Sequence, residues 1–287
     1  MTFLKRRWRI LCVLLACLLV LCSAGVVFYH GEWWFGRWIS LTRRGELALT
    51  VYGESADTTH WRYAELISTE GVIASDVMRL VNSDYPLPIG YEPMLVEYNG
   101  AKMHPLMRDS YIALRDTVQA ETGVRIYVAS DYRTPEEQAD IMASAAPGIA
   151  AQVGSSEHEA GLALDVYAPY FDGMKFLRSR AGRTVNSTCH EYGFIVRYPY
   201  GKESVTGISY EPWHLRYVGA PHAELISQSG LTMEEYFDAL DPNVWYAYEH
   251  YLIARLAPEE LNLPNGWTSC EISPDNMGYY IVTLSFS

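Results

Sequence analysis

Residue types that ligate zinc stand in two short motifs of this chain. His158 and Asp165 belong to the first motif, and His214 ends the second, which begins at Glu211. A catalytic zinc site needs three nitrogen or oxygen ligands and one open position, and these three residues supply that number. Zinc held in this way polarises a carbonyl and lowers the pKa of water toward neutrality. The chemistry that fits is hydrolysis, although either spacing taken alone is also consistent with a structural role.

A carboxylate for proton transfer stands next to the last histidine. Hydrolysis of an amide needs a base that takes a proton from water and passes it to the leaving amine. Glu211 is the candidate, three residues before His214. In a regular strand the two side chains would point to opposite faces. We therefore expect a turn or bulge at Pro212.

A third motif, which ends at Arg133, offers a cation. The sequence Ser130-Asp131-Tyr132-Arg133 follows a predicted strand. A fixed guanidinium there could clamp a carboxylate or stabilise a developing oxyanion. The alternative is a surface arginine in a turn.

The elements that must position these residues alternate without a regular βαβ order, which favours an α+β domain with a largely antiparallel sheet. Leu164 and Val166 flank Asp165 in a predicted strand, so Asp165 points away from this apolar pair. Apolar spacing from Met107 to Val118 indicates a helix that Gly123 ends. Strands are predicted at 124–129, 162–167, 194–198, 213–218 and 278–286. Further helices are predicted at 61–67, 72–81, from 134, and at 222–228, 233–240 and 244–256.

The N-terminal segment has the pattern of an export signal. An apolar run from Ile10 to Tyr29 follows four basic residues. About 20 apolar residues are long enough to cross a bilayer core, and the basic flank favours a cytoplasmic N-terminus. An uncleaved anchor is the first interpretation, because Trp33, Trp34 and Trp38 follow the run and suit a membrane interface. A signal peptide cleaved near Ala24 and a lipoprotein signal remain alternatives.

The rest of the chain is strongly acidic. The net charge is −12, and the first thirty residues hold four basic residues and no acid. The remainder has 22 − 4 = 18 basic and 34 acidic residues, a charge of 18 − 34 = −16. Such a body repels phosphate backbones, which argues against nucleic-acid binding. Outside the apolar run only Cys189 and Cys270 remain; they form either one disulfide or two separately buried thiols.

Several motifs in one order resemble the VanY-type D-alanyl-D-alanine carboxypeptidases, zinc metallopeptidases of the bacterial cell wall. The resemblance covers about residues 80–236, roughly half of the chain. The motifs that carry it are Ser-Glu-His-x-x-Gly-Leu-Ala-x-Asp from Ser156, the Tyr-Arg pair at 132–133, the stretch at 192–207 and Glu-Pro-Trp-His-x-Arg-Tyr-Val-Gly from Glu211.

The resemblance implies a fold and a set of roles. The fold is the small α+β domain that these peptidases share with hedgehog-type signalling domains. His158, Asp165 and His214 match the family's ligands for one Zn²⁺ per chain, and Glu211 matches its base. Arg133 matches the arginine that holds the substrate and steadies the transition state. The family's peptide contacts fall at Gln138, Ser156 and Trp213.

The implied reaction is removal of the terminal D-Ala from a peptidoglycan stem peptide by water. Alternatives are a D,D-dipeptidase or an L,D-type wall peptidase on the same fold, or a non-catalytic wall-binding domain. The expected organisation is an anchor at 1–30, a juxtamembrane stretch at 31–70, the peptidase domain at 71–240 and a C-terminal extension at 241–287 whose role the sequence does not reveal. The expected location is the bacterial cell membrane, with one span and the catalytic domain outside the cytoplasm.

One position departs from the family pattern. The turn before Arg133 reads Ser-Asp-Tyr-Arg, where Ser-Gly-Tyr-Arg is usual. Asp tolerates unusual backbone angles better than most residues, so the turn can form. Asp131 also adds a negative charge close to the expected binding place of a substrate carboxylate, which is where this protein is expected to differ from its relatives.

Overall fold

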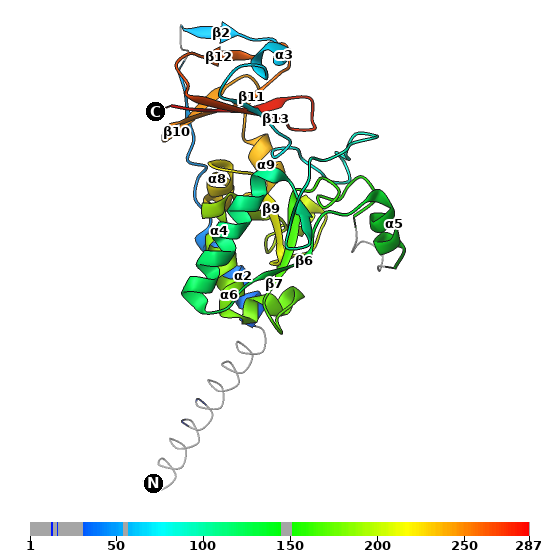
Figure 1. The fold of residues 1–287 in the computed structure, drawn as a ribbon. Coiled ribbons are helices and arrows are strands. Elements are labelled where there is room, and N and C mark those ends of the chain that lie inside the picture. The colour runs from blue at the N-terminus through cyan, green and yellow to red at the C-terminus, as the bar shows by residue number, and fades with distance from the viewer. Residues whose placement is uncertain (1–12, 14–15, 17–30, 54–56, 145–150, 287) are drawn as a thin grey trace, which may run out of the picture.

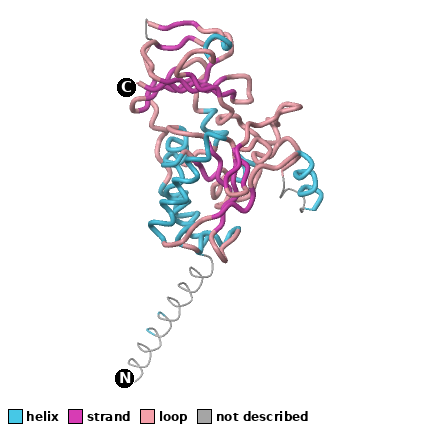
Figure 2. Tube along the Cα trace, viewed as in Figure 1, coloured by secondary structure: helices cyan, strands magenta, loops and turns pink. Residues whose placement is uncertain are grey.

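The computed structural model describes Val13, Ala16 and residues 31–53, 57–144 and 151–286 (Figure 1). Two sheets stand one above the other in Figure 1, with helices α8 and α9 between them. Most helices surround the first sheet, whereas the lobe of the second sheet is almost entirely strand and loop (Figure 2). The architecture is α+β, as predicted.

The first sheet has four antiparallel strands in the order β6-β7-β9-β8. Its strands are β6 (Tyr127–Ser130), β7 (Ala163–Tyr167), β8 (Phe194–Val196) and β9 (His214–Tyr217). All four fall where alternating apolar residues predicted strands. A separate hairpin of β4 (Val96–Tyr98) and β5 (Ala101–Met103) precedes these strands in the sequence.

Helices cover this sheet, and side-chain caps and a glycine mark the ends of two of them. The long helix α4 (Pro105–Thr122) ends at Gly123, whose φ of 75° is the left-handed conformation that glycine adopts at little cost. Helix α5 (Pro135–Ser144) begins with the predicted reciprocal cap, because Thr134 and Glu137 bond to each other's backbone N–H. The other helices are α2 (Gly31–Thr42), α3 (Tyr63–Leu66), α6 (Arg180–Thr188), α7 (Glu203–Thr206), α8 (His222–Ser229) and α9 (Met233–Asp238), with 3₁₀ turns at Gly173–Arg178 and Cys189–Tyr192.

The second sheet joins segments from opposite parts of the chain, in the order β1-β10-β11-β14-β13-β3. Its strands are β1 (Thr50–Val51), β3 (Val72–Ala74), β10 (Trp245–Tyr248), β11 (Tyr251–Leu256), β13 (Ser269–Pro274) and β14 (Tyr280–Ser285). A small ladder of β2 (Thr58–His60) and β12 (Asn262–Pro264) accompanies it. The stretch at 31–70 and the extension at 241–287 therefore contribute strands to shared sheets.

Two helix predictions are wrong. Residues 72–81 form strand β3 and then turns, in which Val77, Met78, Leu80 and Val81 are buried at irregular spacing. Residues 244–256 form the β10–β11 hairpin, with Glu249 at a φ of 50° in its two-residue loop. Both segments are rich in apolar residues, whose spacing suggested helices. Pairing with other strands of the second sheet overrides this local preference.

Buried apolar residues bind the two lobes together. One cluster joins Leu162 and Ile195 of the first lobe to Tyr236 of α9 and to Ile253 and Ile281 of the second sheet. Helices α8 and α9 thus lie in a core that both sheets share. His222 adds a polar link, since its ring bonds to Tyr236 and to Thr283 of β14, each at 2.8 Å.

The two cysteines of the body are separate buried thiols. Cys189 packs in the cluster under the first sheet, and Cys270 packs in the cluster on the outer side of the second sheet. The disulfide alternative is therefore wrong.

Among the described residues, no helix has both the length and the apolar character needed to cross a bilayer. The predicted anchor from Ile10 to Tyr29 lies outside the described residues, apart from Val13 and Ala16.

The shared core gives a stability prediction. Ile253 is completely buried between the lobes, whereas Ile73 of β3 in the same sheet is 48% exposed. Ile253→Ala should lower the free energy of unfolding by about 2 to 5 kcal/mol, and Ile73→Ala should change it by less than about 0.5 kcal/mol. Urea denaturation of both variants measures this. Equal losses would mean that the second sheet does not share a core with the first.

Candidate metal and catalytic site

Register in the first sheet brings Asp165 and His214 together. The two residues are direct partners across β7 and β9, and Ser130 of β6 is opposite Asp165 on the other side. Directly opposed residues of an antiparallel pair project to the same face. The next pair, Leu164 and Leu215, projects into the core below. The predicted orientation of Asp165 is thereby confirmed.

His158 reaches the same place from a tight turn that precedes β7. Gly161 closes this turn with a φ of +67°, and its N–H donates to His158 O at 3.0 Å. The left-handed φ favours glycine here, and a Cβ at position 161 would lie 2.6 Å from Leu95 Cδ2, so the leucine side chain would have to shift. The glycine of the first motif therefore sets the path that delivers His158.

Donor atoms of the three residues surround one small space. Within the described residues, His158, Asp165 and His214 form a group whose ligand atoms lie within 4.8 Å of one another. His158 Nε2 is 3.4 Å from Asp165 Oδ2, and His214 Nδ1 is 3.0 Å from Asp165 Oδ1. The other ring nitrogens are engaged: His158 Nδ1 donates to Asp131 O at 2.7 Å, and His214 Nε2 lies 3.3 Å from Glu157 Oε2. This pattern leaves Nε2 of one ring and Nδ1 of the other for a metal ion, so the donor set fits zinc.

The acidic neighbours of His214 favour its protonated form. Burial lowers the pKa of His214, but hydrogen bonds and charges from Asp165 and Glu157 outweigh burial and raise it to about 9. Burial likewise raises the pKa of Asp165, yet the two histidines bring it well below its usual range. A metal ion at His214 Nδ1 would compete with a proton for this nitrogen, so metal binding is expected to strengthen as the pH rises.

Glu211 lies at the rim of this group. Pro212 and Trp213 form the predicted turn, in which His214 N–H donates to Glu211 O at 3.2 Å. Asn186 holds the turn, since its Nδ2 donates to Pro212 O at 2.8 Å. Glu211 Oε2 comes within 3.8 Å of His214 Nδ1, and burial raises the pKa of this carboxyl. A half-buried carboxylate with a raised pKa is suited to accept and return a proton.

Arg133 is fixed on the opposite side of Asp165. Its Nε and Nη2 donate to Ser130 Oγ at 3.2 and 2.9 Å, and its Nη1 donates to Gln138 Oε1 at 3.1 Å. Nη2 also lies 3.5 Å from Asp165 Oδ2. Gln138 is itself tied by its Nε2 to Ala151 O at 2.8 Å. The guanidinium is therefore a rigid cation beside the candidate metal ligands.

The other predicted contacts lie close by. Ser156 is buried in the turn that carries His158, and Trp213 packs its ring against the core of the first lobe. The carboxylate of Asp131 accepts the N–H of Lys102 in β5 at 2.5 Å, while its carbonyl accepts His158 Nδ1. The main chain of Asp131 therefore orients His158, and its carboxylate bonds to the neighbouring hairpin.

Several residues of this site were not anticipated from the sequence. Ser130 anchors Arg133, and the ring of Tyr198 lies 4.8 Å from that of His214. Glu157, Arg197 and Arg216 form buried ion pairs behind His214. Charged residues within otherwise apolar strands are the signal that points to such pairs.

Two imidazoles and a carboxylate around one space, with a carboxyl group and a fixed guanidinium beside them, define a site suited to metal-dependent hydrolysis. The family model of VanY, D-alanyl-D-alanine carboxypeptidase, matches residues 100–220, which hold all of these groups. The chain belongs to the VanY family.

Individual relatives agree with this assignment. The chain is 35% identical over 178 residues to a D-alanyl-D-alanine carboxypeptidase of Enterococcus faecalis, covering 55% of this chain and 65% of that protein, just under two thirds of its length. It is 34% identical over 191 residues to the bifunctional D-Ala-D-Ala dipeptidase and D-Ala-D-Ala carboxypeptidase VanXYC of Enterococcus gallinarum, covering 59% of this chain and 97% of that protein. A solved variant of the vancomycin-resistance D,D-pentapeptidase VanY, in complex with Zn(II), has 35% identity and a TM-score of 0.51, covering 56% of this chain and 98% of that one.

The central place of Asp165 gives a prediction about metal content. Asp165→Ala removes the carboxylate that lies between the two rings, so zinc content after dialysis should fall from near one equivalent to near zero. Asp140→Ala, on the exposed side of α5, is the matched control and should keep its zinc. Elemental analysis of the purified proteins decides. Equal zinc in both variants would remove Asp165 from the ligand set.

Proposed function

We propose that this protein is a zinc-dependent D,D-carboxypeptidase that removes the terminal D-Ala from peptidoglycan stem peptides. The observation that carries the proposal is the convergence of three metal donors, Glu211 and Arg133 within one region of a VanY-family fold. The proximity of these residues, which come from three separate stretches of the chain, supports the roles proposed for them.

One zinc ion per chain is proposed at His158, Asp165 and His214. When bound, zinc would polarise the scissile carbonyl and make water more acidic. The protein's part is to hold three donors at fixed positions, two of them rings whose second nitrogen is already engaged.

Arg133 is proposed to bind the carboxylate at the end of the substrate. Its guanidinium is held on two sides by Ser130 and Gln138, so little conformational freedom is lost when a carboxylate binds. Because the side chain of Gln138 is occupied in this support, we assign Gln138 to the positioning of Arg133. Ser156 and Trp213 remain proposed contacts of the peptide.

Glu211 is proposed as the base. It would take a proton from the attacking water and pass it to the nitrogen of the leaving D-Ala, so that the amide bond breaks to an amine and an acid. Its carboxylate is 22% exposed, which leaves one side open toward a bound peptide.

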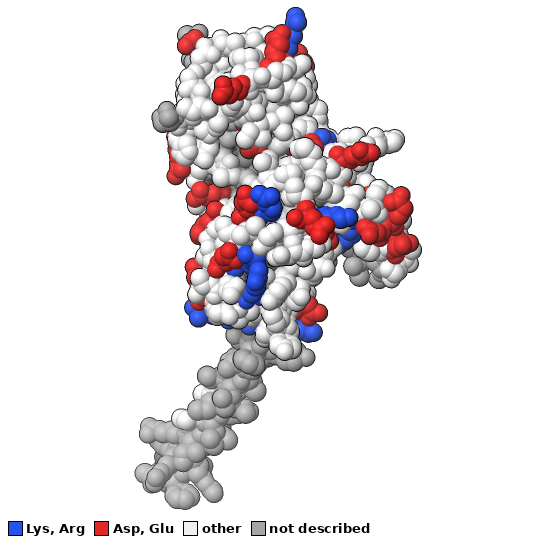
Figure 3. All heavy atoms as spheres, viewed as in Figure 1, with Lys and Arg blue, Asp and Glu red and all other residues white. Residues whose placement is uncertain are grey.

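The location proposed for the enzyme is the outer face of the cytoplasmic membrane. Helix α2 follows the predicted anchor and exposes Trp34, Trp38 and Leu41, at four- and three-residue intervals along one face, by 46%, 56% and 51%. Aromatic residues in such a position suit a membrane interface. Figure 3 shows Asp and Glu side chains over both lobes on this face, with Lys and Arg side chains among them. The net charge of −12 supports the proposal that nucleic acid is not a partner.

Cell fractionation tests the location. The full chain should sediment with membranes and resist a carbonate wash, and it should be cleaved by protease added outside intact spheroplasts. A chain that begins at residue 31 should remain in the soluble fraction. Recovery of the full chain in the soluble fraction would contradict membrane anchoring.

Digestion of a purified stem pentapeptide tests the activity. Mass spectrometry should find loss of one alanine, whereas release of an intact D-Ala-D-Ala would identify a dipeptidase, an outcome that the similarity to a bifunctional relative makes worth measuring. Shortening of a tetrapeptide would identify an L,D-type enzyme.

Glu211→Gln should keep its zinc and lose about 10²- to 10⁴-fold in kcat; unchanged turnover would exclude Glu211 as the base.

A further inference from the structure

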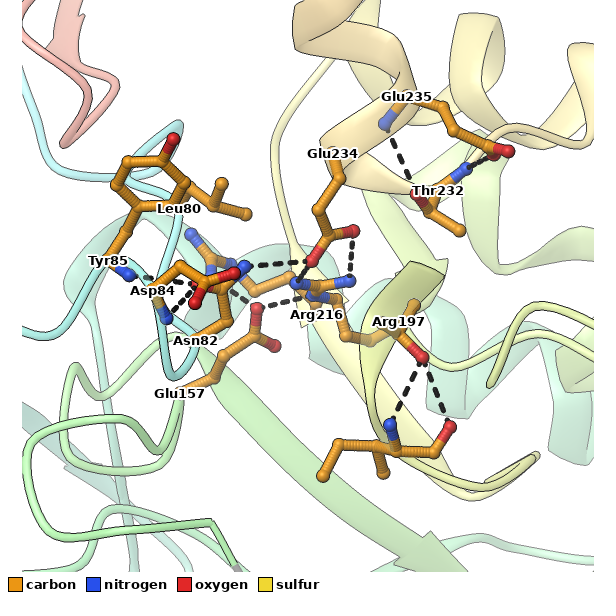
Figure 4. Close-up of polar contacts among 12 residues, drawn as sticks. Leu80, Asn82, Asp84, Tyr85, Glu157, Arg197, Arg216, Thr232, Glu234 and Glu235 are labelled. Carbon is orange, nitrogen blue, oxygen red and sulfur yellow. Dashed lines mark hydrogen bonds and ion pairs between the residues drawn. The ribbon is translucent and has the colours of Figure 1, made fainter. Parts of the chain in front are cut away.

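A buried network of four charged residues lies directly behind the metal ligands. Glu157 Oε1 accepts from Arg197 Nε at 2.6 Å and from Arg216 Nη1 at 2.8 Å (Figure 4). Arg197 also donates twice to Glu234 of α9, at 2.9 and 2.6 Å. The side chains of Glu157, Arg197 and Arg216 are completely buried, and Glu234 is 15% exposed. Two arginines balance two glutamates, so the group is neutral as a whole.

The arginines fix the direction in which Glu157 points. Because both arginines donate to Oε1, that oxygen cannot turn away from them without losing two charge-assisted hydrogen bonds. Oε2 is thereby held toward the metal site, 3.3 Å from His214 Nε2. Arg216 is anchored further by Val77 O and Arg79 O, at 2.9 and 2.7 Å. The carboxylate is a preset acceptor for the N–H of His214.

We infer that Glu157 is a positioning residue of the zinc site: with Arg197 and Arg216, it holds the proton of His214 on Nε2 and leaves Nδ1 for the metal. The inference rests on the proposed zinc site. A carboxylate at this position cannot donate, so Nε2 must carry a proton to bond to it. His158 obtains the opposite arrangement from Asp131 O, which takes its Nδ1–H. The dipeptide Glu157-His158 therefore supplies one ligand directly and orients the other.

Glu157→Gln tests this role without a change of shape. The arginines are donors, so the amide oxygen must face them and the amide NH₂ must face His214. Nε2 then has to accept, and the proton moves to Nδ1, where it competes with zinc. The dissociation constant for zinc, measured by chelator competition, should rise roughly 10- to 100-fold.

Glu234→Gln is the matched control. It removes the same charge from the same network, and Glu234 bonds to Arg197 and to Asn82 (Figure 4). Both variants should lower the melting temperature, but the zinc affinity of Glu234→Gln should stay within about threefold of wild type. Equal zinc affinities of the two variants would overturn the inference and reduce Glu157 to a structural ion pair.

An NMR spectrum of the wild-type protein tests which nitrogen of His214 carries the proton, even if Glu157→Gln does not fold. In ¹⁵N–¹H correlations of the zinc form, His214 should show a slowly exchanging proton on Nε2 and His158 one on Nδ1. A proton on Nδ1 of His214 would refute the inference. Failure of the wild type to bind zinc would instead refute the proposed function, so the two outcomes are distinguishable.

Discussion

The pairing of β7 with β9 is the constraint on which the site depends. It sets Asp165 opposite His214 on one face and Leu164 opposite Leu215 on the other. A slip of one residue would exchange these faces, burying the carboxylate and exposing the leucines. The apolar core below the sheet thus holds the register, and the register holds the two ligands at a distance that one ion can span.

The surroundings of this pair are arranged so that each of the three proposed ligands has a second partner. His158 bonds to a backbone carbonyl, His214 to a buried carboxylate, and Asp165 lies beside a guanidinium that is itself fixed by Ser130. Rings supported at one nitrogen lose less freedom when the other binds a metal ion. The rigidity of the site comes from these contacts more than from the ligands themselves.

The sequence was sufficient to predict the local features of the first lobe. Strand alternation around Asp165, the glycine stop at Gly123 and the cap at Thr134 depend on neighbouring residues alone, and the structure confirms them. Ser130 and Gln138, which fix Arg133, are three and five residues away from it, but the sequence pattern did not show that their side chains turn toward the guanidinium. Residues 72–81 and 244–256 were misassigned because their conformation depends on strand partners far away in the sequence. The buried partners of Glu157 are Arg197, directly after β8, and Arg216 of β9, which lie 40 and 59 residues away along the chain, so no local pattern predicts these ion pairs.

The parallel pairing of β3 with β13 has a consequence for how the molecule assembles. Every strand of the first sheet lies between Tyr127 and Tyr217, whereas the partner of Val72 is Cys270, on the far side of that whole segment. Contacts that close long loops form slowly, because the chain loses its entropy before the contact is made. The first sheet can therefore form before β3 joins the second sheet, because each of its pairings closes a shorter loop than the pairing of Val72 with Cys270. The loop that this pairing closes contains every strand of the first sheet, so the stability of the candidate metal site depends in part on strands outside its own sheet.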